Sequence, residues 1–160
     1  MRPGPIVGTL FLLLLALYGG GLWFLWDLEI TREYESYEAA ADDNVFGGGW
    51  LPDFIPDSAT RMSVTNDLDY NTSRGEFRYD PVDTPAFLAQ LRPWEGGGAP
   101  FDDFAARVAQ MESRGFRPYE FAADGNVWVF FVDAADGRVE YDMWPDFADP
   151  SDAVGPTAWD

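Results

Sequence analysis

Aspartates alternate along one short stretch in a spacing that could bind calcium. Asp67, Asp69 and Asn71 give the D-x-D-x-N opening of an EF-hand loop. That loop then needs a glycine at its sixth position and a glutamate at its twelfth. The chain has Thr72 and Arg78 there. Because both positions fail, we predict a hairpin turn on an acidic surface rather than a calcium site.

The same region contains a second chemical possibility, an anion site. Arg61, Arg74 and Arg78 surround the predicted hairpin, and guanidinium groups bind carboxylates and phosphates well. Acidic residues are equally near in the sequence, namely Asp67, Asp69 and Asp80. We therefore expect these arginines and aspartates to pair with one another.

The missing residue types exclude much chemistry. The chain has no cysteine, no histidine and no lysine. Disulfide scaffolds, Cys/His zinc sites, histidine-based triads, Schiff-base lysines and the phosphate-binding P-loop are therefore impossible. Carboxylates remain, but no pair stands out among 28 acidic residues. We assign no catalytic, cofactor-binding or metal-ligating residue, and we expect no cofactor.

The charge of the chain limits its partners. The net charge is −18 at pH 7, and all the acidic residues lie from Asp27 onward. Such a charge repels nucleic acid, so we expect no nucleic-acid partner. A salt-rich habitat and a surface tuned for solubility both explain this acidity, and the sequence does not separate them.

The N-terminal segment predicts a location. Ile6 to Trp26 is an uncharged apolar run, long enough to cross the roughly 30 Å core of a bilayer as a helix. A cleaved signal peptide is the alternative, although the run exceeds the usual length of one and lacks an A-x-A site. Arg2 precedes the run and acidic residues follow it. We expect the N terminus in the cytoplasm of a single-pass protein and the rest outside the cell membrane.

The composition then divides the chain into five parts. The predicted boundaries are a cytoplasmic N terminus at 1–5, a transmembrane helix at 6–26, a juxtamembrane connector at 27–49, an extracytoplasmic domain at 50–147 and an irregular tail at 148–160. The first part of the connector, up to Ala41, is expected to continue the helix for a few turns. Its triple glycine, Gly47 to Gly49, then ends regular structure.

The remaining pattern predicts five strands and two helices. Residues of alternating polarity indicate a hairpin, and a β-meander follows later in the chain. Between them, Thr84-Pro85 is typical of a helix start, and an apolar stripe predicts a longer helix. The predicted strands are 61–65, 76–80, 117–122, 127–132 and 138–143, and the predicted helices are 84–92 and 101–114. The order ββ–αα–βββ favours class α+β, a small antiparallel sheet with its helices on one face.

One apolar stretch has two interpretations. Trp50, Leu51, Phe54 and Ile55 lie together with two prolines just after the connector. They would form either a partner-binding patch or a lid over the sheet. We favour the core, because most large apolar residues are buried.

Part of the chain resembles a family of bacterial membrane-anchored or exported small proteins of uncharacterised role. The resemblance lies between Leu51-Pro52 and Leu88. The matching residues are Pro56, Ser58, Ala59, Phe77, Tyr79, Asp80, Phe87 and Leu88. It implies a location in the cell envelope and transfers no activity or site residue.

We therefore expect a non-catalytic interaction or accessory module of the cell envelope. Its predicted partners are the lipid bilayer, through residues 6–26, and a membrane or envelope protein. Two alternatives stay open, namely an extracytoplasmic hydrolase that uses carboxylates and a cation-binding domain.

Overall fold

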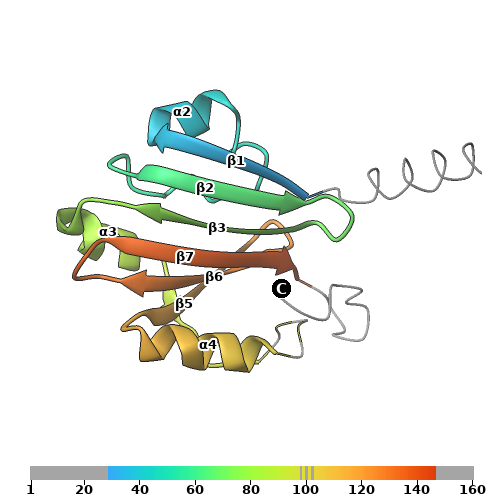
Figure 1. The fold of residues 1–160 in the computed structure, drawn as a ribbon, viewed down its shortest axis with the longest axis vertical. Helices are drawn as coiled ribbons and strands as arrows, with labels where there is room; N and C mark the ends of the chain where they lie inside the picture. The colour runs from blue at the N-terminus through green and yellow to red at the C-terminus, as the bar shows by residue number, and fades with distance from the viewer. Residues whose placement is uncertain (1–28, 98, 100, 102, 147–160) are drawn as a thin grey trace, which may run out of the picture.

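The protein is built around one seven-stranded sheet. A computed structural model describes residues 29–97, 99, 101 and 103–146. All paired strands are antiparallel, in the order β1-β2-β3-β7-β6-β5-β4, as Figure 1 shows. The strands are β1 (Glu29–Ser36), β2 (Thr60–Asp67), β3 (Thr72–Arg78), β4 (Arg92–Pro93), β5 (Arg117–Ala123), β6 (Asn126–Asp133) and β7 (Arg138–Pro145).

Helices contribute little to this part of the chain. They are α2 (Tyr37–Asp42), the 3-10 helix η1 (Pro81–Asp83), α3 (Thr84–Leu88) and α4 (Phe104–Ser113). The predicted class, α+β with the order ββ–αα–βββ, is therefore wrong. The described residues form a β-rich domain. The prediction failed because it omitted β1 and β4 and gave the helices too much weight.

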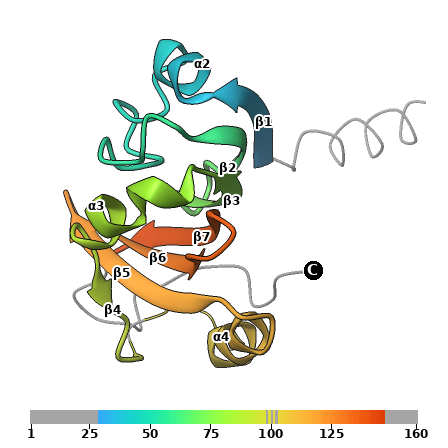
Figure 2. The same ribbon diagram turned by 90° about the vertical axis from the view of Figure 1, so that its left-hand side faces the viewer.

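The prediction that the helices share one face is also wrong. Phe87 of α3 packs into one apolar cluster with Phe130 of β6, whereas Phe104 of α4 packs into another with Phe131. Successive strand residues point to opposite faces, so α3 and α4 cover opposite sides of β6 (Figure 2). The run Val127 to Val132 is apolar on both faces for this reason.

Residues 29–49 belong to the sheet and its cover. Glu29–Ser36, assigned above to a connector with a continuing helix, instead form the edge strand β1, which pairs with β2 from Glu29↔Asp67 to Ser36↔Thr60. Its side chains are mostly exposed, so it lacks the alternating apolar pattern that identifies a half-buried strand. Ser36 then caps α2 by accepting a hydrogen bond from the backbone N–H of Ala39.

The predicted transmembrane helix at 6–26 lies outside the described residues. Among the residues that the structure describes, no helix is long and apolar enough to cross a membrane.

The stretch Trp50 to Ile55 covers one face of the sheet. Leu51 and Ile55 are fully buried, and Trp50 and Phe54 pack partly buried against the same cluster. The prediction that this stretch belongs to the core is confirmed. The alternative, an exposed apolar patch, is wrong.

Candidate anion-binding pocket

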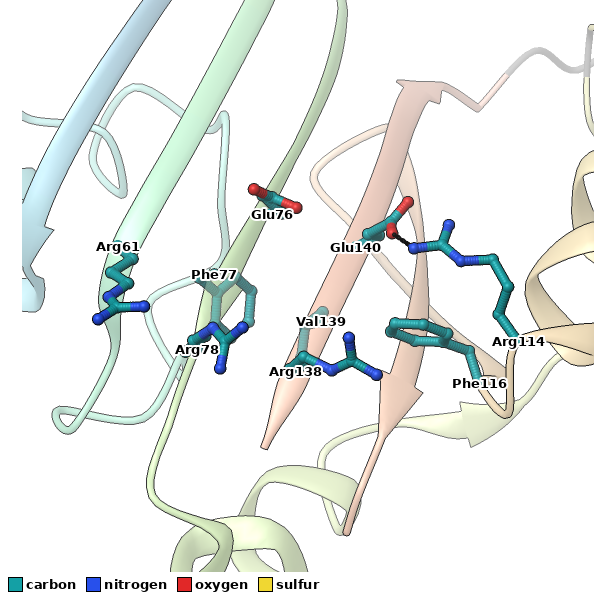
Figure 3. Close-up of a pocket in the computed structure, with 9 residues that line it drawn as sticks. All are labelled: Arg61, Glu76, Phe77, Arg78, Arg114, Phe116, Arg138, Val139 and Glu140. Atoms are coloured by element: carbon teal, nitrogen blue, oxygen red, sulfur yellow. Dashed lines mark ion pairs between the residues drawn. The ribbon is translucent and has the colours of Figure 1, made fainter. Parts of the chain in front are cut away.

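Four arginines line one cavity of about 240 Å³ on the α4 side of the sheet. The chain has only ten basic residues against 28 acidic ones, so four in one cavity is a strong local concentration. Two glutamates accompany them. The charged lining residues are Arg61, Arg78, Arg114, Arg138, Glu76 and Glu140. Figure 3 shows Arg61 on β2, Arg78 on β3 and Arg138 on β7 in a row across the three strands.

A bulge in β2 places Arg61. Thr60 pairs with Arg78 and Ser63 with Glu76, so two residues of β2, Arg61 and Met62, lie opposite one residue of β3. Arg61 has φ +50°, a left-handed conformation that in this type of bulge normally belongs to glycine. A bulge re-aims the side chain at its site. A non-glycine residue in this conformation costs about 1–2 kcal/mol.

The register of β3 and β7 places two like-charged pairs side by side. Arg78 lies directly opposite Arg138, and Glu76 directly opposite Glu140. Like charges in directly opposed positions destabilise a sheet. The pairing therefore concentrates charge at the cavity instead of neutralising it across the strands.

The end of α4 supplies the fourth arginine and the cavity's aromatic wall. The N–H of Phe116 donates to the carbonyl of Met111, and the N–H of Gly115 donates to that of Glu112. These two bonds, with Gly115 at φ +93°, form a Schellman motif. The motif buries Phe116 beside Met111 and turns the chain just after Arg114.

Phe116 lies between two guanidinium groups. The Cζ atoms of Arg114 and Arg138 are each 5.2 Å from its ring centroid. This distance is within the range of cation–π attraction. The ring therefore stabilises two cations that would otherwise repel each other.

Not all of these charges are neutralised within the protein. Arg114 contacts Glu140 at 2.9 Å, and Arg138 contacts Asp133 at 2.7 Å. The Arg138 guanidinium lowers the pKa of Asp133, which stays ionised. Within the described residues, the side chains of Arg61, Arg78 and Glu76 form no hydrogen bond or ion pair, and Nε of Arg138 is buried without an acceptor.

A buried ion pair holds α4 beside the cavity. Arg107 donates through Nε to Asp142 at 2.5 Å and through Nη2 at 3.3 Å, and it lies 3.8 Å from Glu140. Asp142 is fully buried. Burial raises its pKa to about 6, although the nearby Arg107 opposes that rise.

The structure answers the earlier site predictions for the acidic stretches. Asp67 accepts hydrogen bonds from the N–H groups of Asp69 and Tyr70, and Asn71 has φ +52°. The predicted turn between β2 and β3 is confirmed. Among the described residues, no three acidic side chains are placed to hold a metal ion.

Among the described residues, Arg61 and Arg78 do not form the predicted pairs with nearby aspartates. Arg74 pairs with Glu29 at 3.1 Å, across β2. Asp80 instead caps η1 by accepting from the N–H of Val82. Arg61 and Arg78 face the cavity, so the anion-site interpretation, which was set aside from the sequence, describes these two residues better.

Arg114 and Arg138 were missed entirely. They reach the cavity because β3 pairs with β7, a contact between residues far apart in the chain. One signal was present in the sequence. Arg114 ends a predicted helix and Arg138 begins a predicted strand, although nothing local links them to Arg61 and Arg78.

Residues 29–78 match the model of a family described as the YbbD head domain. The match covers less than a third of the chain. It comprises β1, β2 and β3, and so brings Arg61, Glu76 and Arg78 but not the residues from β7 and α4. No curated protein and no solved structure matches the chain.

This match supports the predicted resemblance to a family at a coarse level. Its residues overlap the stretch from Leu51 that carried the resemblance. The Leu-Pro and Pro-x-Ser-Ala motif and the membrane anchoring associated with it are not confirmed by the match.

Proposed function

We propose that this protein is a non-catalytic interaction module that binds an oxyanion group, a carboxylate or a phosphate, in the arginine pocket. One observation carries this proposal. Arg61 and Arg78 lie beside Arg138 in one cavity, without acidic partners of their own in the described part of the chain. The net charge of the whole chain is −18. Guanidinium groups bind such oxyanions with short, charge-assisted hydrogen bonds.

The size of the cavity defines what it accepts. Its volume of about 240 Å³ lies below the roughly 300–1,000 Å³ of sites that enclose a drug-sized ligand. It therefore takes a single anionic group with its nearest atoms. The bulk of the partner stays outside.

The acidic surface adds selectivity. The long-range field of the protein repels anions, and the local arginines attract them only at short range because salt screens exposed charges beyond about 8–10 Å. An isolated polyanion is therefore a poor ligand. A single oxyanion presented by an otherwise neutral or basic partner suits this site.

We place this activity at the cell membrane, on its outer side, with an envelope protein as the partner. The support is in the sequence. Arg2 precedes the uncharged run Ile6 to Trp26, and acidic residues follow it, the charge order of a protein whose N terminus is cytoplasmic.

Calorimetric titration with acetate and with inorganic phosphate, each a single small oxyanion, tests the anion site. The double variant Arg61→Ala/Arg78→Ala should bind at least tenfold more weakly, since hydrogen bonds to charged groups contribute about 1.5–3 kcal/mol each. The matched control is Arg32→Ala/Arg92→Ala. It removes two charges whose ion pairs lie with Asp43 and Glu120, away from the pocket.

Two outcomes would overturn the proposal. One is that the wild-type protein binds neither anion in low-salt buffer. The other is that the control variant loses as much affinity as the pocket variant, which would make the binding a property of overall charge.

A further inference from the structure

A second cavity, of about 260 Å³, lies between β1, β2 and the segment that follows α2. It shares no lining residue with the arginine pocket. Its lining combines two aromatic rings with two amides and one ion pair. The residues that matter are Trp50, Tyr34, Asn44, Asn66, Asp43 and Arg32.

Asp43 is held in place as an acceptor. Tyr34 donates its hydroxyl to Oδ2 at 2.6 Å, and Arg32 donates to the same oxygen. These two hydrogen bonds lower the pKa of Asp43, so the carboxylate stays ionised. The other oxygen, Oδ1, has no hydrogen-bond donor among the described residues and is available to a ligand.

The amide of Asn66 is fixed in the opposite sense, as a donor. Its Oδ1 accepts the hydroxyl of Ser73 at 2.9 Å. Ser73 in turn lies 3.2 Å from the hydroxyl of the buried Tyr141. A serine hydroxyl donates only once, so Tyr141 donates to Ser73 and Ser73 to Asn66. This series of hydrogen bonds uses Oδ1 of Asn66, so Nδ2, which has no acceptor among the described residues, can donate to a ligand.

The aromatic wall of the cavity is Trp50. Its backbone carbonyl accepts a hydrogen bond from the indole of Trp128 at 3.1 Å, which fixes the residue against the core. Its own Nε1 has no acceptor among the described residues. A Cβ on Gly48 would meet the backbone oxygen of Asn44 at 3.0 Å and Cδ1 of Trp50 at 3.1 Å, so glycine lets the turn pack closely beside the ring.

Asn44 adds a second amide beside the ring. It has φ +61°, a left-handed conformation that asparagine tolerates better than most residues. Its side chain forms no hydrogen bond with the described residues. The cavity therefore has an aromatic wall and several uncommitted hydrogen-bonding groups of both kinds.

We propose that this cavity binds a neutral carbohydrate unit. A sugar ring has an apolar face of C–H groups, which packs on an indole, and a rim of hydroxyls that both donate and accept. Asp43 Oδ1 provides an acceptor, and Nδ2 of Asn66 and Nε1 of Trp50 provide donors. The cavity's cation, Arg32, is engaged by Asp43, and the chain is strongly acidic, so anionic sugars are disfavoured.

This site is independent of anion binding in the arginine pocket, so either proposal can fail alone. The test is an NMR titration of the full chain, labelled at tryptophan, with chitotriose, cellotriose and maltotriose at millimolar concentration. We expect at least one trisaccharide to shift the indole Nε1–H signal of Trp50 in a saturable way.

Three variants make the result specific. Trp50→Leu keeps an apolar side chain on the core and should weaken binding at least tenfold, as should Asn66→Ala. Asn44→Gly removes an amide but keeps the left-handed backbone without strain. It should also weaken binding, and it replaces Trp50→Leu as the test if that variant does not fold. Arg78→Ala should leave binding unchanged. No shift with any of the three sugars, or equal affinity in wild type and in Asn44→Gly and Asn66→Ala, would overturn the proposal.

Discussion

Arg78 and Arg138 lie directly opposite each other on β3 and β7, although like charges in that position destabilise a sheet. Arg138 has an acidic partner in Asp133, whereas Arg78 has none among the described residues. The sheet therefore holds one uncompensated cation beside a compensated one, at the wall of the arginine pocket. The repulsion between them predicts opposite effects on stability and on binding.

Arg78→Glu should stabilise the fold while it abolishes anion binding. The substitution turns a repulsive cross-strand pair into an attractive one, which is worth roughly 0.2–1 kcal/mol. Urea denaturation measures the stability, and phosphate titration measures the binding. Arg92→Glu is the control, since it breaks the exposed pair with Glu120 and should not stabilise. If Arg78→Glu lowers stability, the two arginines do not repel each other as inferred.

Arg61→Gly should also raise stability while it weakens anion binding, for a different reason. Glycine relieves the left-handed conformation at φ +50°, so we expect a gain of about 1 kcal/mol in the free energy of unfolding. Phosphate affinity should fall. Asn71→Gly, in the exposed turn at φ +52°, should change stability less and phosphate affinity not at all. A loss of stability in Arg61→Gly would show that its side chain holds the bulge.

Gly75→Ala tests the close packing of β2 against β3. A Cβ at this position would meet the carbonyl oxygen of Ser63 at 1.9 Å and the ring of Tyr141 at 2.9 Å. Since the backbone must move, we expect a loss of about 2–3 kcal/mol or more. Gly115→Ala meets no atom but has φ +93°, so its cost should stay near 1 kcal/mol. Thermal unfolding of the two variants compares them, and equal costs would contradict the clash.

Asp142 should make the protein more stable at mildly acidic pH than at neutral pH. Its folded pKa is about 6, above an unfolded value of about 3.9. Between these values the folded chain binds a proton that the unfolded chain does not. Its contribution to the free energy of unfolding is therefore full below about pH 4 and is lost as the pH rises through about 6, by about 3 kcal/mol.

The variant Asp142→Asn isolates this effect. Urea denaturation between about pH 4 and pH 7 should show a smaller pH dependence in the variant than in the wild type. Asp43 and Asp133 have lowered pKa values, so their contributions fall away as the pH drops below about 5. That loss has the opposite sign and is common to the wild type and the variant, so the difference between the two profiles reports Asp142. Identical pH profiles would show that the ion pair with Arg107 keeps Asp142 ionised throughout.

Local pattern predicted most of the strands. Alternation identified the β2–β3 hairpin and the meander β5–β7, and Gly115 marked the end of α4 correctly, because these signals involve residues close in sequence. Strand β1 was missed because Glu29–Ser36 is an exposed edge strand with the composition of a solvated helix. The prediction also missed that both faces of the sheet are covered. The sequence of β6 indicated this, since a strand that is apolar on both sides needs a cover on both.

The arginine pocket was predictable only in part. Arg61 and Arg78 belong to one hairpin, so their proximity followed from the sequence. That they lack acidic partners among the described residues did not follow from it. This depends on a bulge at Arg61 and on a register that places Arg138 opposite Arg78. Register between strands that are distant in the chain is set by tertiary packing rather than by local pattern.

The pairing of β3 with β7 also has a consequence for how the chain folds during synthesis. The family-matched segment ends at Arg78, and until β7 is made, β3 presents an open strand edge, a template for aggregation. A ribosome that adds about 5–20 residues per second needs roughly 3–15 s to reach the end of β7 at Pro145. Translation speed, or a chaperone that covers β3 meanwhile, should therefore control the yield of native protein.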